Sequence, residues 1–360
     1  MARSRGFNAR AAGFVQDGRL CHGPAAMNVP IFLAHDPDMR ARYYGERALA
    51  GLRALGPVVL NPTDRALTPA ELIAAAENAR IIVADRMTVG PAEVFAALPD
   101  LAAFVRVAVD IRNIDVAAAS AAGVLVTQAS PGFAAAVAEL GLGFMIALAR
   151  RIPEAVSAYR AGRDPEVVMG RQLAGATLGI VGFGTIGRRL ATSALALGMR
   201  VLVNDPYAEP PAPPVERVEL PELLDVADFV VCLAVANERT ENLFGDAEFS
   251  AMKSSAFFIN LSRGNLVDEA ALARALDQEV IAGAAMDVGR APDQMPSPLL
   301  AGRPDVLATP HVGGLTPQSV EHQALETVAQ VAEILQGRAP KGAVNAVDWR
   351  RRELIRGGRS

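Results

Sequence analysis

Short apolar runs alternate with stretches of helical periodicity along the chain from Val29 to Gln128. The apolar runs are four to eight residues long, as buried strands are, and the segments between them space apolar residues as one helix face does. Strands are therefore expected at residues 29–34, 57–60, 80–85, 101–108 and 124–128, and helices at 46–56, 68–79, 91–99 and 115–123. Alternation of this kind predicts a parallel sheet with helices on both faces.

The same alternation resumes at Thr177 and continues to Pro310, with strands expected at residues 177–182, 199–205, 228–235, 255–262, 280–288 and 305–310. Between the two runs, residues 132–152 form a long apolar stretch, which predicts one helix buried between domains. A last helix is expected over residues 316–337, with Thr316 as N-cap and Gly337 as its stop. The predicted fold class is α/β, with two doubly wound parallel-sheet domains.

Composition is that of a large folded protein. At 360 residues, 51% hydrophobic and 21% charged, the chain can bury enough apolar surface for two domains. Its net charge of −4 and pI near 5.7 give no electrostatic footprint for nucleic acid or an anionic membrane. No apolar run approaches the ~20 residues that cross a bilayer. The only cysteines, Cys21 and Cys232, lack the spacing of a metal site or a disulfide framework, which predicts a reduced, cytoplasmic protein without a bound metal.

The two ends of the chain lack the pattern of packed elements. Residues 1–27 show neither strand nor helix periodicity and no apolar core of a secretory signal, so we expect a disordered extension there. Residues 346–360 are strongly basic and are expected to form a frayed tail.

The strongest chemical signal is a glycine motif between an expected strand and an expected helix. Gly182, Gly184 and Gly187 stand at GxGxxG spacing. In such a turn the first glycine permits the tight bend, the second lets a pyrophosphate approach the backbone, and the third lets helix and strand pack closely. Thr185 and Ile186 then lie at the start of the helix, where unpaired N–H groups bind phosphate. The motif predicts a dinucleotide cofactor.

Asp205 ends the next expected strand, 18 residues after Gly187. A carboxylate at this position can accept hydrogen bonds from the ribose hydroxyls and would repel a 2′-phosphate. No arginine follows it directly, so NAD is expected rather than NADP. The alternative is that Asp205 only caps the turn before Pro206.

Further motifs follow the glycine motif in a set order. They read LSRGNLVDEAAL at 261–272, AGAAMDVG at 282–289 and ATPHVGGLT at 308–316. Together with residues 111–126 and 130–150, these motifs resemble the D-isomer-specific 2-hydroxyacid dehydrogenases over about residues 29–344.

This resemblance implies a two-domain enzyme with its site in the cleft between the domains. The substrate domain would comprise residues 28–128 and 310–345, and a Rossmann NAD-binding domain would comprise residues 129–309. It also implies a homodimer built through the NAD domain. The reaction would be hydride transfer between the nicotinamide and C2 of a 2-oxo or 2-hydroxy acid.

Three residues match catalytic or cofactor positions of the family. Arg263 matches the catalytic arginine, and a guanidinium can bind a substrate carboxylate and polarise the adjacent carbonyl. Asp287 matches the aspartate that holds the nicotinamide carboxamide. His311 matches the general acid/base, and an imidazole suits reversible proton transfer near neutrality. Without the resemblance, these would be a solvated turn arginine, a strand-end cap and a structural histidine.

The predicted substrate loop departs from the family pattern. Family members carry a glycine-rich loop whose backbone N–H groups bind the substrate carboxylate. Here the matching residues are Ala108, Val109 and Asp110. Asp110 would repel an acid substrate unless Arg112 or Arg86 neutralises it.

Two more departures concern the pocket wall and the histidine's partner. Phe133 stands where an asparagine is common, which predicts a more apolar wall. The glutamate that pairs with the family's histidine is missing, because Ala291 or Pro292 occupies its place. Asp293 is the only acid in that loop, and it is either the partner of His311 or a rim residue beside an unpartnered histidine.

The function predicted from these observations is an NAD-dependent D-2-hydroxyacid dehydrogenase that reduces a small 2-oxo acid. One alternative is a dehydrogenase of the same fold with another hydride donor, such as formate or phosphite. Another is a non-catalytic NAD(H)-sensing binding protein. The presence of both Arg263 and His311 argues against a protein without catalysis.

Overall fold

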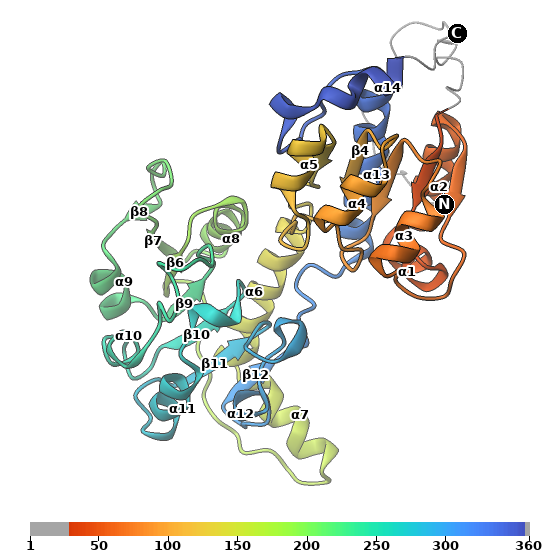
Figure 1. The fold of residues 1–360 in the computed structure, drawn as a ribbon. Helices are drawn as coiled ribbons and strands as arrows, with labels where there is room; N and C mark the ends of the chain where they lie inside the picture. The colour runs from red at the N-terminus through yellow and green to blue at the C-terminus, as the bar shows by residue number, and fades with distance from the viewer. Residues whose placement is uncertain (1–28, 357–360) are drawn as a thin grey trace, which may run out of the picture.

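A computed structural model describes residues 29–356, so the extension expected at residues 1–27 lies outside the described residues. The first sheet is parallel and has five strands in the order β2-β1-β3-β4-β5 (Figure 1). Its strands are β1 (Ile31–Leu33), β2 (Val58–Leu60), β3 (Ile81–Ala84), β4 (Ala103–Arg106) and β5 (Leu125–Thr127). The helices that follow these strands are α1 (Pro37–Tyr43), α2 (Gly45–Leu55), α3 (Pro69–Ala75), α4 (Ala92–Ala97) and α5 (Val116–Ala122).

Successive strand residues pack into different cores on the two faces of this sheet. Ile31 and Leu33 join a core with α2 and with α13 (Pro317–Leu335), whereas Phe32 joins the opposite core with α3, α4 and α5. This is the period-2 alternation of a strand covered on both faces. The parallel sheet with helices on both faces, predicted from the apolar runs, is confirmed.

The second sheet is also parallel and has seven strands in the order β12-β11-β10-β9-β6-β7-β8. Its strands are β6 (Thr177–Val181), β7 (Arg200–Asn204), β8 (Glu216–Arg217), β9 (Phe229–Cys232), β10 (Phe257–Asn260), β11 (Gly283–Met286) and β12 (Val306–Ala308). Its helices are α8 (Thr185–Ala196), α9 (Leu220–Val226), α10 (Asp246–Ser250), α11 (Glu269–Asp277) and α12 (Pro298–Ala301). The strand order reverses beside β6, and open α/β sheets bind ligands at such a switch point, outside the carboxyl ends of the strands.

The long apolar stretch between the sheets forms one helix, as predicted for residues 132–152, and after a break a second, shorter helix follows it. Helix α6 (Ala134–Ala149) contacts α8, β10 and β11, and α7 (Ile152–Arg160) then projects away from the second sheet (Figure 1). The break falls at Arg151, whose φ of 49° is left-handed, directly before the first turn of α7 with its Pro153. Proline cannot continue a helix because it lacks an N–H and its ring clashes with the preceding turn.

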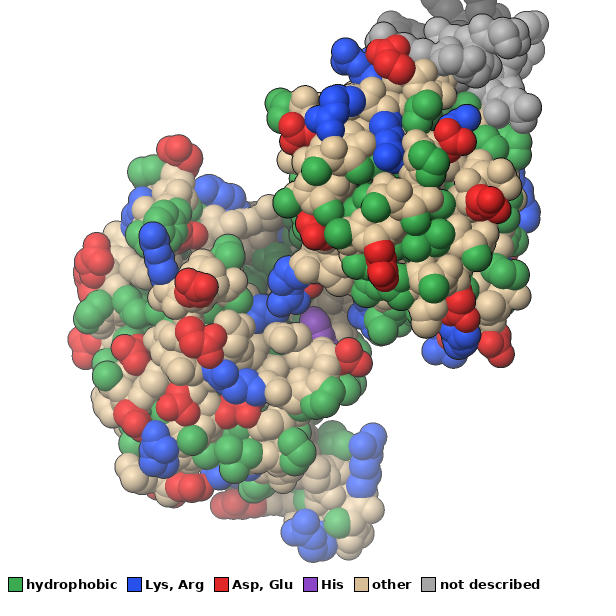
Figure 2. Space-filling view, viewed as in Figure 1, with side chains coloured by type: hydrophobic (Ala, Val, Ile, Leu, Met, Phe, Trp, Pro, Cys, Tyr) green, Lys and Arg blue, Asp and Glu red, His purple; other side chains and the backbone are tan. Residues whose placement is uncertain are grey.

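The chain returns to the first sheet through α13. Its N-cap Thr316 accepts a hydrogen bond from the Ser319 backbone N–H, and the chain leaves the helix near Gly337 with φ 74°, as predicted. The two sheets form separate lobes, and Lys or Arg side chains and a histidine gather between them (Figure 2). Within residues 29–356, none of the helices combines the length and apolar character needed to cross a membrane.

The prediction of a frayed tail at residues 346–360 is wrong for the part that the structure describes. Two short 3-10 helices (Ala346–Asp348 and Arg350–Arg352) and α14 (Glu353–Arg356) follow α13. Trp349 is buried beside the first sheet and donates from its indole N–H to the Ala102 carbonyl at 3.0 Å, and Ile355 is fully buried. Two apolar side chains hold this basic segment in place, because their burial offsets the entropy lost on ordering it.

Candidate active site

The glycine turn between β6 and α8 has the geometry that a pyrophosphate needs. Gly182 adopts φ 101°, and a Cβ there would lie 2.5 Å from the Ala234 backbone nitrogen. A Cβ on Gly187 would collide with the Gly182 carbonyl, whereas Gly184 faces open space. Helix α8 begins at Thr185, and the Gly184 N-cap supplies no side chain to its first N–H groups. The turn is therefore tight where it contacts protein and open where backbone N–H groups can reach an anion.

Asp205 follows β7 beside this turn and is held by three backbone N–H groups. Its carboxylate accepts from Phe183 at 2.7 Å, Tyr207 at 2.9 Å and Ala208 at 3.1 Å. Burial alone would raise the pKa of this carboxyl, but these hydrogen bonds outweigh burial and lower its pKa. Asp205 is consequently ionised and fixed in orientation at the edge of the turn.

An arginine lies beside Asp205, although none follows it directly in sequence. Arg217 of β8 donates to the backbone carbonyl of Asp205 and to that of Ala208. The pairing of β7 with β8 brings it there, because Val203 stands in register with Arg217. Just beyond Asp205, an open cavity of about 510 Å³ is lined by Tyr207, Asn237, Glu238 and Arg239.

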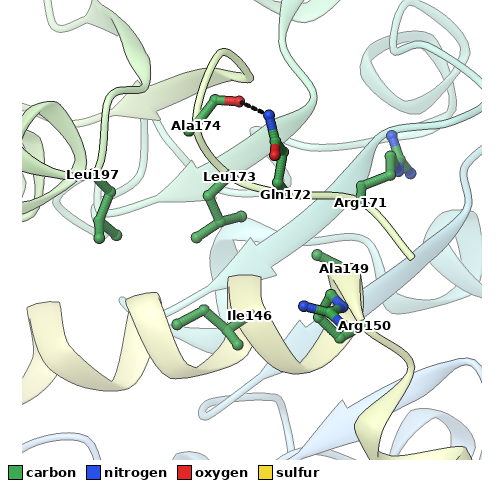
Figure 3. Close-up of a pocket in the computed structure, with 8 residues that line it drawn as sticks. All are labelled: Ile146, Ala149, Arg150, Arg171, Gln172, Leu173, Ala174 and Leu197. Atoms are coloured by element: carbon green, nitrogen blue, oxygen red, sulfur yellow. Dashed lines mark hydrogen bonds between the residues drawn. The ribbon is translucent and has the colours of Figure 1, made fainter. Parts of the chain in front are cut away.

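A second cavity, of about 320 Å³, lies away from these residues at the C-terminal end of α6 (Figure 3). Its lining consists of Ile146, Ala149 and Arg150 from the end of α6, residues 171–174, and Leu197. Gln172 and Ala174 are joined across one wall by a hydrogen bond of 3.3 Å. The cavity contains none of the residues predicted to bind cofactor or substrate.

Asp287, at the end of β11, anchors the loop that carries His311. Its buried carboxylate accepts from the Thr309 hydroxyl at 2.6 Å and from the backbone N–H groups of Val312 and Gly313, both at 2.8 Å. Its backbone carbonyl also accepts from the His311 N–H at 2.9 Å. The role of Asp287 in positioning His311 was not foreseen from the sequence, which suggested only a contact with cofactor.

The His311 ring is oriented by the main chain of Asp293. Its Nδ1 lies 2.8 Å from the backbone carbonyl oxygen of Asp293, while the Asp293 side chain is exposed. Asp293 and Gln294 both adopt left-handed φ values, 58° and 61°, and this turn directs the carbonyl towards the ring. A carbonyl can only accept, so the bonded Nδ1 carries a proton and Nε2 is left for a reacting group.

Arg263 follows β10 and is half-buried beside the loop after β11. Asn260 donates from its side-chain amide to the Arg263 carbonyl at 2.9 Å, and the next residue, Gly264, touches the backbone of Gly289, two residues beyond Asp287. Burial lowers the pKa of the Arg263 guanidinium, and the positive charge of Arg112 lowers it further, against the opposing effect of Asp110. Residues of both domains therefore act on this guanidinium.

Asp110 and Arg112 form an ion pair on the loop after β4. The guanidinium of Arg112 donates to both carboxylate oxygens, with distances of 2.6 to 3.0 Å. These bonds, against the effect of burial, lower the pKa of Asp110 to about 2, and Arg263 contributes to the shift. Of the two arginines proposed to neutralise Asp110, Arg112 does so, while Arg86 lies over the Tyr43 ring at 5.7 Å.

The buried Arg106 fixes the position of this loop. It lies within β4 and donates to the carbonyls of Asp85 and Thr88 and to the Asn113 side chain. Arg106 thereby joins the loop after β3 to the loop that carries Ala108, Val109 and Asp110. The apolar run around Arg106 predicted only a strand, although a lone arginine inside such a run is a signal of a buried polar contact.

Comparison with known proteins agrees with these features. Residues 142–313 match the model of the D-isomer specific 2-hydroxyacid dehydrogenase NAD binding domain. The D-3-phosphoglycerate dehydrogenase of Methanocaldococcus jannaschii is 33% identical over 284 residues, covering 78% of this chain and 54% of that protein.

Two solved structures align over nearly their whole length. One, a protein from Thermus thermophilus, has 31% identity and a TM-score of 0.77, covering 88% of this chain and 100% of the other. The second is an NAD-complexed D-isomer specific 2-hydroxyacid dehydrogenase from Lactobacillus delbrueckii ssp. bulgaricus. It has 26% identity and a TM-score of 0.74, covering 88% of this chain and 99% of that one.

This chain belongs to the D-isomer specific 2-hydroxyacid dehydrogenase family. The predicted family and its cofactor, NAD, are confirmed, and residues 142–313 lie within the NAD-binding domain. The glycine turn fits the cofactor, since only Gly184, where a phosphate would approach, faces open space. The chain spans about half the length of the curated dehydrogenases it matches.

An aromatic side chain forms the wall beside the histidine loop. Phe133 is the N-cap of α6, and a Cβ on Gly314 would lie 3.1 Å from the Phe133 Cβ. The phenylalanine therefore packs on the turn that follows His311. This contact places an aromatic side chain where the resemblance implies an asparagine.

Proposed function

We propose that the protein is an NAD-dependent D-2-hydroxyacid dehydrogenase that acts as a 2-oxo acid reductase. The observation that carries the proposal is that the turn after Arg263 contacts Gly289 on the loop after β11, and that Asp287 and Asp293, which flank Gly289, hold the loop of His311 by hydrogen bonds. A cation for a carboxylate and an oriented proton donor are thus held on adjoining loops. Fixed positions of the reacting groups lower the barrier to catalysis, because the entropy of orienting them is lost before the reaction.

Arg263 binds the substrate carboxylate and polarises the neighbouring carbonyl, since a guanidinium is suited to bidentate contact with a carboxylate. NADH bound against the glycine turn would supply the hydride. His311 donates the proton from Nε2 to the oxygen at C2, because its Nδ1 is engaged by the Asp293 carbonyl. Asp287 acts by holding the histidine loop, and its contact with the nicotinamide carboxamide is part of the same proposal.

The orienting carbonyl takes the place of the glutamate that the resemblance implies. A carbonyl accepts the Nδ1–H whether the ring is neutral or cationic, so it sets the tautomer and direction of the ring. A carboxylate would in addition stabilise the imidazolium by its charge. Within residues 29–356, His311 is therefore oriented by the main chain, and no acidic side chain bonds its ring.

NADH oxidation in the presence of a panel of 2-oxo acids tests this function. Turnover should fall by roughly 10²–10⁴-fold in Arg263→Ala and in His311→Asn, the range for electrostatic and acid–base groups. Arg338→Ala and His322→Asn are matched controls, because these side chains lie at or near α13 and bond Glu333 and Ser130. Binding of NADH without turnover of any acid would favour a sensing protein, and oxidation of formate or phosphite alone would replace the proposed substrate class.

We also propose that the enzyme is a cytoplasmic homodimer in which a second copy covers the α7 arm. Tyr159 on α7 is 67% exposed, and Val167 and Met169 in the following segment are 100% and 96% exposed. Apolar side chains exposed together mark an interaction surface, and this one belongs to the NAD domain. Light scattering should give twice the chain mass, and Tyr159→Glu should give monomers, whereas Val347→Glu, 97% exposed on the tail, should not.

A further inference from the structure

The carbonyl that orients His311 belongs to a loop that is closed by its own backbone. We call residues 289–295 the orienting loop. The Gly289 N–H donates to the Gln294 carbonyl at 2.8 Å, which closes the loop around Asp293. The Asp293 carbonyl in turn lies 2.8 Å from the His311 ring nitrogen. The direction of that carbonyl therefore depends on how the base of the orienting loop is held.

Arg290 binds the base of the orienting loop to the segments around it. Its guanidinium donates hydrogen bonds of 2.6 to 3.0 Å, whose acceptors are the Val267 and Asn265 carbonyls and the side chains of Glu241 and Asn242. The two carbonyls lie in the segment that directly follows Arg263. Their neighbourhood is also tied internally, because the Asn242 N–H donates to the Asn265 carbonyl at 2.9 Å. The guanidinium therefore joins the orienting loop to a segment that has its own hydrogen bonds.

The main chain of Arg290 is held separately from its side chain. Glu269, which is buried in the first turn of α11, accepts from the Arg290 N–H at 2.8 Å. A Cβ on Gly264 would lie 2.7 Å from the Arg290 nitrogen, and a Cβ on Gly289 would lie 2.9 Å from the Glu269 carboxylate. The segment after Arg263, the orienting loop and α11 therefore meet with no room for a side chain at either glycine.

We propose that Arg290 is a positioning residue that orients His311 through the Asp293 carbonyl. The inference rests on the proposed function and adds a residue to its mechanism. A guanidinium suits this role because its donors lie in a fixed plane and can bind several acceptors at once. Because a neutral carbonyl rather than a carboxylate sets the direction of the ring, that direction depends on the position of the orienting loop.

A positioning role and a purely structural role predict different effects. The ion pair of Arg290 with Glu241 is partly exposed, at 36% and 44% of the two side chains, and such pairs add little to stability. A positioning role predicts a folded protein with a lower kcat. The largest expected loss equals that of one orienting hydrogen bond, roughly 5- to 150-fold. A purely structural role predicts a lower melting temperature with the kcat of the wild type.

The kinetic test uses the full chain, saturating NADH and the 2-oxo acid that is turned over fastest in the panel. Arg290→Ala should lower kcat within the range given above and leave the affinity for NADH unchanged. Arg290→Lys keeps a charge beside Glu241 but lacks the planar fork, so it should fold and show a smaller loss in kcat. The matched control is Arg274→Ala, because Arg274 makes a comparable exposed pair with Asp246 away from the orienting loop. It should leave kcat unchanged.

A double variant shows whether Arg290 acts through His311. Two residues that act on the same step do not add their effects, whereas independent residues do. In a His311→Asn background, Arg290→Ala should therefore lower kcat by less than about a further twofold. Losses that multiply in the double variant, or wild-type kcat in both Arg290→Ala and Arg290→Lys, would overturn the inference.

Nuclear magnetic resonance gives a readout that does not need turnover. In protein labelled with ¹⁵N-histidine, the proton on His311 Nδ1 is assigned by its absence in His311→Asn. It should be observed in the wild type and in Arg274→Ala, and it should be lost or reduced in Arg290→Ala as the second tautomer appears. An unchanged His311 signal in Arg290→Ala would also overturn the inference. Absence of any 2-oxo acid turnover would instead overturn the proposed function, while this signal would still decide the role of Arg290.

Discussion

The orientation of His311 by a main-chain carbonyl leads to an unusual expectation for Asp293. In an enzyme with a carboxylate partner, removing the acid costs roughly 10²–10⁴-fold in rate. Here the contact of 2.8 Å is made by the backbone oxygen, which Asp293→Asn retains. We expect kcat/KM for 2-oxo acid reduction to stay within about twofold of wild type, with an unchanged pH profile.

Two further substitutions at the same position separate backbone from side chain. Asp293→Gly keeps the carbonyl and adopts the left-handed φ of 58° without strain, so it should remain active. Asp293→Pro fixes φ near −65°, which turns the carbonyl away from the ring. Loss of one orienting hydrogen bond, worth about 1–3 kcal/mol, corresponds to roughly a 5- to 150-fold lower rate.

The assay is the pH profile of kcat/KM with NADH in the four proteins, and melting temperatures show whether each variant is folded. The reasoning is refuted if Asp293→Asn lowers the rate by roughly 10²-fold or more and moves the basic limb to lower pH. That outcome would mean that the carboxylate turns onto His311 in the working enzyme. A fully active Asp293→Pro would show that the carbonyl contact has no part in catalysis.

Two other predictions concern the cofactor and the tail. Asp205→Ser should weaken the preference for NADH over NADPH without abolishing turnover. The substitution removes a negative charge at the ribose and leaves Arg217 near a 2′-phosphate. The KM values for NADH and NADPH measure the change in preference. Trp349→Ala should lower the free energy of unfolding by about 3–5 kcal/mol, as loss of a buried aromatic side chain does, and a denaturant titration that shows less than about 1 kcal/mol would contradict the packing described.

Most of the fold could be predicted from the sequence because strand and helix periodicities agree with the residues that end each element. The error at the C-terminal end falls where a few residues override a longer pattern. Trp349 and Ile355 bury a segment whose composition is basic, and averaging over the segment hides two such anchors.

The candidate site was also predicted only in part from the sequence. Motif residues such as Arg263 could be located from their neighbours in sequence, but their contacts could not. The role of the Asp293 carbonyl cannot be predicted from the sequence, because every residue has a backbone carbonyl. The direction of this carbonyl depends on two residues with left-handed φ values. Arg217 reaches Asp205 through the pairing of β7 with β8, which the sequence did not predict because β8 has only two residues.

Two of the three departures in the substrate site change its charge. Relative to the pattern that the resemblance implies, one acid is lost behind the histidine and one is gained at Asp110, in the loop that would hold the substrate carboxylate. Behind His311 a neutral main-chain carbonyl keeps the ring oriented, and on the substrate loop Arg112 pairs with Asp110. The ring is therefore positioned without the charge of a carboxylate, and a carboxylate on the substrate loop is held by its own arginine.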